Sequence, residues 1–243
     1  MRSYILIAFF TLFSCKNESV DNTSSIAIST IADITDPFDL GPDANAILSL
    51  YRFPENENQE AYFRFLSITD KGLNPCLEYQ IEDGKKSQLA HYGLDYQLRK
   101  KLIIGFYDSI RQWLSSFQYD HTRDTSLSHS ECFQTIAAEI NLISRRKVDK
   151  AIIVAFTDLQ ENSKIFNCYN PPKTDPDAIA DLLITAYPLP LDLRRFKIYI
   201  VYNPTTRDED MRFCHMIMVY RKILEPRGAN VIVQAQNDHY EYE

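Results

Sequence analysis

A run of six consecutive apolar residues, AIIVAF at positions 151–156, constrains the fold of this chain most strongly. A strand that is apolar on both faces has to be covered on both faces, which is typical of a parallel sheet between two layers of helices. The run KIYIVY at 197–202 is a second strand of the same kind. The sequence therefore predicts an α/β fold.

Strands and helices alternate along the rest of the chain. The expected strands are, in order, 25–32, 61–68, 76–81, 151–156, 197–202 and 230–233. The expected helices are one that opens at Pro42, a long one over 96–117, one capped by Ser128, one that starts at Asp175 and Pro176, and one capped by Thr206 that runs to about 224. This alternation indicates a single α/β domain with a mostly parallel sheet. A turn around 70–72 makes the second and third strands a hairpin.

Two of these helices carry specific local signals. In the helix over 96–117, apolar residues three and four positions apart form one stripe, which we expect to be buried. Its members are Leu98, Leu102, Phe106, Ile110, Trp113 and Phe117. The segment from Ser128 to Glu131 fits a capping box, so the Ser128 side chain is expected to cap the helix that follows.

The N-terminus has the pattern of an export signal. Arg2 is the only charge before the apolar run 5–13, and that run is shorter than the ~20 residues that a membrane-spanning helix needs. The letters LFSC at 12–15 resemble the lipobox of bacterial lipoproteins. This resemblance implies cleavage before Cys15 and lipid chains on that cysteine.

The resemblance also divides the chain and gives it a location. Residues 1–14 are then a lipoprotein signal peptide, 15–24 a polar lipidated tether, 25–236 the α/β domain, and 237–243 an acidic, solvated tail. The protein is expected on a membrane of the bacterial cell envelope, facing the periplasm or the exterior. Its 26 Lys and Arg against 33 Asp and Glu give a net charge of −7, which argues against nucleic acid as a partner.

Four cysteines remain after Cys15. They are Cys76, Cys132, Cys168 and Cys214. An exported chain reaches an oxidising compartment, where four cysteines can form two disulfides in three pairings. Buried free thiols are an equally open alternative.

The order of elements over 25–235, namely strand, helix, hairpin, two helices, strand, helix, strand, helix and strand, resembles the von Willebrand factor A-type family. The resemblance implies a Rossmann-like three-layer domain. Its six-stranded sheet would be mostly parallel, with one antiparallel edge strand from the hairpin at 61–81. It also places Cys132 and Cys168 above the same edge of the sheet, where they could form a disulfide.

Two strands end in acids, Asp33 and Asp158, and ligands of open α/β sheets bind beyond such ends. The A-type family has a metal-ion-dependent adhesion site there. By resemblance its ligands fall on Asp33, Thr35, Ser130 and Asp158, and the cation would be Mg²⁺ or Mn²⁺. The chain departs from the family pattern at Pro37, which replaces a serine ligand.

A binding function follows from this comparison. We expect a non-enzymatic module that recognises a protein or an envelope component through the edge carrying Asp33 and Asp158. In one version a divalent cation bridges the contact. In the other the contact is free of metal, because the site has degenerated at Pro37. The sequence contains no G-x-S-x-G, Walker A or G-x-G-x-x-G motif. An extracytoplasmic metal-dependent hydrolase that uses the same acidic cleft is the alternative.

Overall fold

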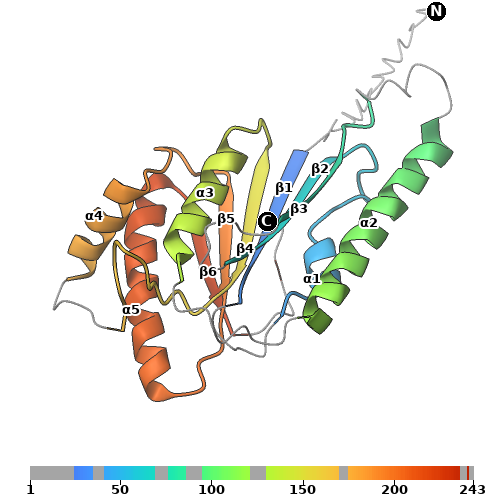
Figure 1. Ribbon diagram of the computed structural model, residues 1–243. Helices are drawn as coiled ribbons and strands as arrows, with labels where there is room; N and C mark the ends of the chain where they lie inside the picture. Colours follow the sequence, from blue (N-terminus) through green and yellow to red (C-terminus); the bar gives the residue numbers. More distant parts are fainter. Residues whose placement is uncertain are drawn as a thin grey trace, which may run out of the picture.

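A computed structural model of the chain has one sheet between two layers of helices (Figure 1). The structure describes residues 25–34, 41–68, 76–85, 95–120, 130–169, 175–235 and 240. The strands are β1 (Ser25–Asp33), β2 (Glu60–Ile68), β3 (Cys76–Ile81), β4 (Lys150–Phe156), β5 (Phe196–Val201) and β6 (Asn230–Gln234). The helices are α1 (Ala44–Leu48), α2 (Asp95–Asp120), α3 (Cys132–Ser144), α4 (Pro176–Ala186) and α5 (Arg207–Leu224), followed by the 3-10 turn η2 (Glu225–Arg227).

The sheet has the order β3-β2-β1-β4-β5-β6. Every neighbouring pair is parallel except β2 and β3, which are antiparallel. A mostly parallel six-stranded sheet with one antiparallel edge strand is thus confirmed. The register sets Ala32 of β1 beside Phe156 of β4. The residues that follow these two, Asp33 and Thr157, therefore emerge at the same edge of the sheet.

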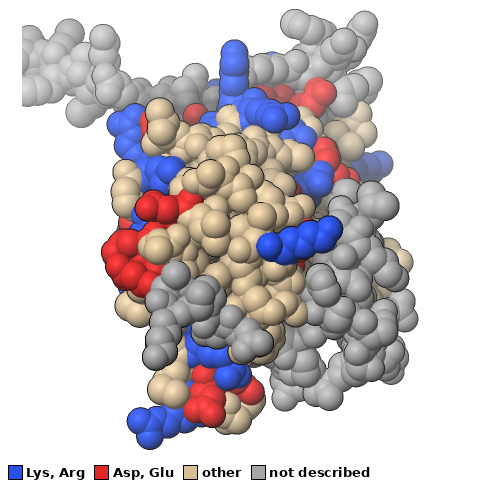
Figure 2. Space-filling model, turned by 60° about the vertical axis from the view of Figure 1, so that its left-hand side comes forward, with Lys and Arg blue, Asp and Glu red and all other residues tan. Residues whose placement is uncertain are grey.

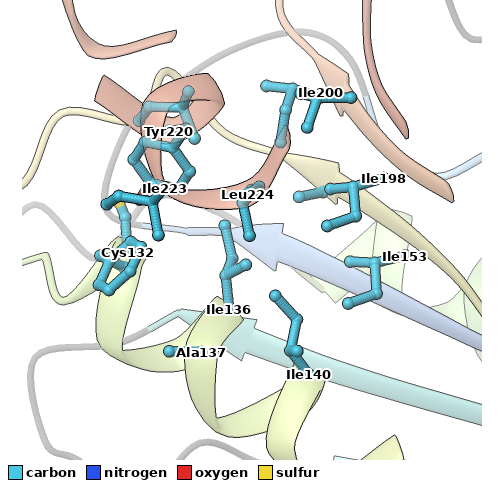
Figure 3. Close-up of a cluster of buried hydrophobic side chains, with 14 of the residues drawn as sticks. Cys132, Ile136, Ala137, Ile140, Ile153, Ile198, Ile200, Tyr220, Ile223 and Leu224 are labelled. Atoms are coloured by element: carbon cyan, nitrogen blue, oxygen red, sulfur yellow. The ribbon is translucent and has the colours of Figure 1, made fainter. Parts of the chain in front are cut away.

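Each face of the sheet has its own hydrophobic core. Alternate residues of β4 point to opposite faces, so Ile153 belongs to the core under α3, α4 and α5, whereas Val154 belongs to the core under α1 and α2. In Figure 3, side chains of α3 and α5 meet those of β4 and β5 over the first of these faces. The apolar run at 151–156 is covered on both sides, as expected.

The buried stripe of α2 differs from the expected one. Phe106, Ile110 and Leu114 are buried, whereas Leu102 is 45% exposed. The reason is helical geometry: each step of four residues turns about 40° beyond a full turn, so a row of such steps drifts around the helix. Leu102 has rotated away from the face that packs on the sheet.

Helix α3 begins at Cys132, with Glu131 in the N-cap position. The expected capping box is therefore wrong, and Ser128 itself lies outside the described residues. The backbone N–H of Phe133, in the first turn, donates instead to Oε2 of Glu161 at 2.8 Å. A carboxylate from the loop after β4 thus caps this helix.

The C-terminal tail differs from the expected solvated segment at one residue, Tyr240. Tyr240 is buried, and its ring centroid lies 5.0 Å from that of Tyr199 in β5. This residue of the expected solvated tail packs on the core, while its neighbours at 236–239 and 241–243 lie outside the described residues. Among the described residues, no helix combines the length and apolar character that crossing a membrane requires.

Candidate functional site

Five polar side chains gather where β1 and β4 end. Asp33 is the last residue of β1, Thr157 and Asp158 follow β4, and Ser130 and Cys132 stand at the start of α3. All five are buried, and the most exposed of them, Ser130, reaches only 7%. We term these five residues the strand-end cluster.

Three donors of this cluster point at one oxygen, Oδ2 of Asp33. Oγ1 of Thr157 lies 3.0 Å from it, and Oγ of Ser130 and Sγ of Cys132 each lie 3.3 Å from it. A buried carboxylate is tolerated when hydrogen bonds compensate its charge. The cluster therefore satisfies Asp33 from within the chain.

The loop after β4 is held tightly beside the cluster. The N–H of Leu159 donates to Oγ1 of Thr157 at 3.0 Å, and the N–H of Gln160 donates to Oδ1 of Asp158 at 2.8 Å. Leu159 has a φ of 59°, a left-handed conformation that a non-glycine residue adopts at a cost of about 1–2 kcal/mol. Such strain persists where the surroundings fix it, and it is concentrated at functional sites.

Burial decides the ionisation of two neighbouring groups. It raises the pKa of the Cys132 thiol well above its usual value, and the negative charges of Asp33 and Glu161 raise it further. Cys132 is therefore a protonated donor at neutral pH. Burial also raises the pKa of Glu161 to about 7, although its hydrogen bond from Phe133 lowers it in part.

The strand-end cluster would offer a cation a mixed set of donors. One oxygen each from Asp33 and Asp158 and the sulfur of Cys132 lie within 4.8 Å of one another, a spacing that a metal ion could bridge. Mg²⁺ and Mn²⁺ take oxygen ligands, however, and thiolate suits softer metals. A protonated thiol lies 3.3 Å from Oδ2 of Asp33, and three donors in all point at that oxygen. The two carboxylates could thus hold a cation, whereas the thiol is a poor ligand for Mg²⁺ or Mn²⁺.

The structure brings together three of the four expected ligands: Asp33, Ser130 and Asp158. Thr35, like Pro37, lies outside the described residues. A cation at this position stays a prediction.

Cys132 has a different role from the expected one. Cys132 and Cys168 are both described, and both are free cysteines. The bridge between them is not formed in this structure, because the sulfur of Cys132 faces Asp33 within the cluster. Thr157 was missed as a site residue, and Cys132 was expected at this edge only as a disulfide partner. Their positions next to predicted ligands, two after Ser130 and one before Asp158, were the available signal.

A chain of contacts links the cluster to the molecular surface. Gln160, whose N–H donates to Asp158, accepts a hydrogen bond through Oε1 from Nε of Arg212 at 2.8 Å. The guanidinium of Arg212 lies 6.0 Å from the ring centroid of Tyr169, which is 58% exposed. We term Tyr169 and Arg212 the edge pair. They present an aromatic ring and a positive charge at the edge where the buried acids lie.

Known proteins resemble this chain only distantly. No protein-family model matches the sequence, and no curated protein matches it. Among solved structures, the SpRpn10 VWA domain is similar, with 11% identity and a TM-score of 0.30 over 85% of this chain and 86% of that one. The human COPII-coat protein Sec24c is 10% identical, with a TM-score of 0.35, over 86% of this chain and 29% of that one. The strand order and the antiparallel edge strand, which agree with an A-type arrangement, establish the fold independently of these two likenesses.

Proposed function

We propose that this protein is a lipid-anchored, non-enzymatic binding protein of a bacterial cell envelope. Its partner, a protein or an envelope component, would contact the sheet edge that carries the strand-end cluster. The LFSC sequence at 12–15 supports the anchor, and the A-type arrangement of the sheet supports a binding role.

The observation that carries the binding site is the contact chain from Asp158 through Gln160 to the edge pair. Tyr and Arg are the residues most often responsible for affinity at protein interfaces. Here a hydrogen bond to the buried Gln160 holds Arg212, so less conformational entropy is lost when a partner binds it. The edge pair would make the contact, and the strand-end cluster would support it from below.

We further propose that this contact is free of metal. A bridging cation would need an accessible position between the partner and the acids, whereas Asp33 and Asp158 are each at most 5% exposed. The same burial argues against the hydrolase alternative, since a metal-bound water would need access to a substrate.

Affinity capture from an envelope extract tests this function. The bait is the wild-type protein, with and without EDTA, beside Tyr169→Ala and the matched control Leu191→Ala. Leu191 is 89% exposed and lies shortly before β5, at the other end of the sheet. We expect the same partner with wild type, with EDTA and with the control, and a loss of capture of at least tenfold with Tyr169→Ala.

Two results would contradict the proposal. Loss of capture in EDTA would favour the cation-bridged version over the metal-free one. Equal capture by wild type and Tyr169→Ala would remove the edge pair from the binding site.

A further inference from the structure

Basic side chains from separate segments meet at the end of the sheet opposite the strand-end cluster. One segment follows the last turn of α3 and includes the first residue of β4, and the other lies at the start of β5. Both are at the end of the sheet where these parallel strands begin. They are Arg145, Lys147, Lys150, Arg194, Arg195 and Lys197. We term these six residues the basic end. Figure 2 shows Lys and Arg side chains gathered at the upper end of the molecule, where α3 finishes and β4 begins in Figure 1.

A hollow of about 290 Å³ opens in the basic end. The buried side chains of Ala151, Ile152 and Phe196 line it together with Lys150 and basic residues of the 194–197 segment. Arg195 is fixed in place there, because its guanidinium donates to backbone carbonyls of the α3–β4 connection. Asp149 and Asn230 also line the hollow, which is therefore apolar inside with four basic residues and one acid around it.

Acidic residues reduce this charge only in part. Asp192 pairs with Arg194 at 2.6 Å, and Asp149 accepts a hydrogen bond from the backbone N–H of Ser25 at 2.8 Å. Arg146, between Arg145 and Lys147, is paired with Glu78, and Glu60 lies beside Ser25. The basic residues at this end still outnumber the acids, on a chain whose net charge is −7. Such a localised surface attracts anions, although the molecule as a whole repels them.

The contact between Asp149 and Ser25 also fixes where the chain toward Cys15 leaves the fold. Nine residues, 16–24, separate the expected lipid anchor at Cys15 from Ser25, which makes ten residue-to-residue steps. Ten residues span at most about 35 Å when fully extended, and about 17 Å on average as a flexible coil. A bilayer that holds the lipid chains of Cys15 is thus close to the basic end.

We propose that the basic end docks on anionic lipid headgroups. The domain would then stand with its strands pointing away from the bilayer and with the edge pair presented to a partner. This orientation rests on the proposed anchor at Cys15, whereas the affinity for anionic lipid does not. Each Lys or Arg held at an anionic membrane surface strengthens binding about fivefold.

Sedimentation with lipid vesicles tests the docking. The sheet and both cores lie within 25–240, so a chain that starts at Lys16 contains the whole described fold without the lipidated cysteine. We expect it to sediment with vesicles of equal parts phosphatidylglycerol and phosphatidylcholine, and to be released by added salt. We expect no sedimentation with phosphatidylcholine alone.

A matched pair of variants locates the binding surface. Arg145→Gln/Lys147→Gln removes two exposed charges of the basic end, and Lys164→Gln/Arg207→Gln removes two exposed charges beyond the opposite ends of β4 and β5. We expect the first variant to bind anionic vesicles roughly twenty- to thirtyfold more weakly and the second to change binding less than twofold. Thermal melting checks that both variants are folded.

Three results would overturn the docking proposal: no binding of the wild-type chain to anionic vesicles, equal weakening by the two variants, or tighter binding to a short DNA duplex than to the vesicles. The anchor is tested separately, by fatty-acid labelling of full-length wild type against Cys15→Ala. Failure of the anchor and failure of the docking are therefore distinguishable.

Discussion

The two ends of this sheet differ in whether their charged side chains are buried or exposed. At the end where β1 and β4 finish, Asp33 and Asp158 are buried, and Asp33 is surrounded by donors from other segments. At the end where β4 and β5 start, the basic residues reach the surface, and the side chain of Arg194 is 82% exposed. The acids of the strand-end cluster are thus buried in the fold, whereas the basic end is exposed on its surface.

This difference separates charges that stabilise the fold from charges that are available to a partner. A buried charge needs fixed partners, and removing one of them leaves desolvated groups without compensation. An exposed charge contributes little to stability but acts over the Debye length, about 8 Å at physiological salt. Substitutions at the strand-end cluster should therefore change folding, whereas substitutions at the basic end should change binding.

The largest expected effect is at Asp33. Asp33→Ala removes the acceptor of three buried donors, and we expect the free energy of unfolding to fall by about 3–4 kcal/mol. Lys147→Ala, at the basic end, should lower it by less than about 0.5 kcal/mol. Urea unfolding measures both. A loss below about 1 kcal/mol for Asp33→Ala would mean that the cluster is not a structural network.

The next effect is a pH dependence at Glu161. Burial raises the pKa of Glu161 from 4.5 to about 7, so the folded state holds this proton more tightly than the unfolded state. Stability due to this group therefore falls as the pH rises from about 4.5 to 7, by roughly 3 kcal/mol in total. Glu161→Gln stays neutral and can still accept from Phe133. We expect it to be more stable than wild type by about that amount above pH 7 and similar to wild type below pH 4.5.

A control accompanies this measurement. Glu225→Gln changes an exposed carboxylate that lies 3.6 Å from Arg221, and its unfolding free energy should follow the wild-type pH profile. If Glu161→Gln also followed the wild-type profile, then burial of Glu161 would not control the pH dependence.

The sheet could be predicted from the sequence because its signals are local. Runs such as 151–156 are apolar over the length of a strand, which identifies them as buried strands. An acid directly after such a strand is then expected at the edge of the sheet where the strand ends. The register that sets Ala32 beside Phe156 then brings Asp33 and Asp158 to one edge. The strands themselves require no knowledge of long-range contacts, whereas the register of β1 on β4 joins residues 124 positions apart.

The features that could not be predicted depend on contacts between distant segments. The start of α3 is fixed by Glu161, which no pattern around Ser128 contains. Cys132 has the spacing of a helical core residue, so its contact with Asp33 was not visible from the sequence. The basic end is split between short runs at 145–150 and 194–197, neither of which stands out in an acidic chain.

The central claim is that hydrogen bonds and a protonated thiol, rather than a cation, complete the strand-end cluster. Calorimetric titration of Mg²⁺ and Mn²⁺ into wild type, Cys132→Ser and Asp158→Ala tests it most directly. We expect no saturable binding by wild type or Asp158→Ala at millimolar cation, and weak binding by Cys132→Ser, whose hydroxyl is a harder ligand. Saturable micromolar binding by wild type that is lost in Asp158→Ala would contradict the claim.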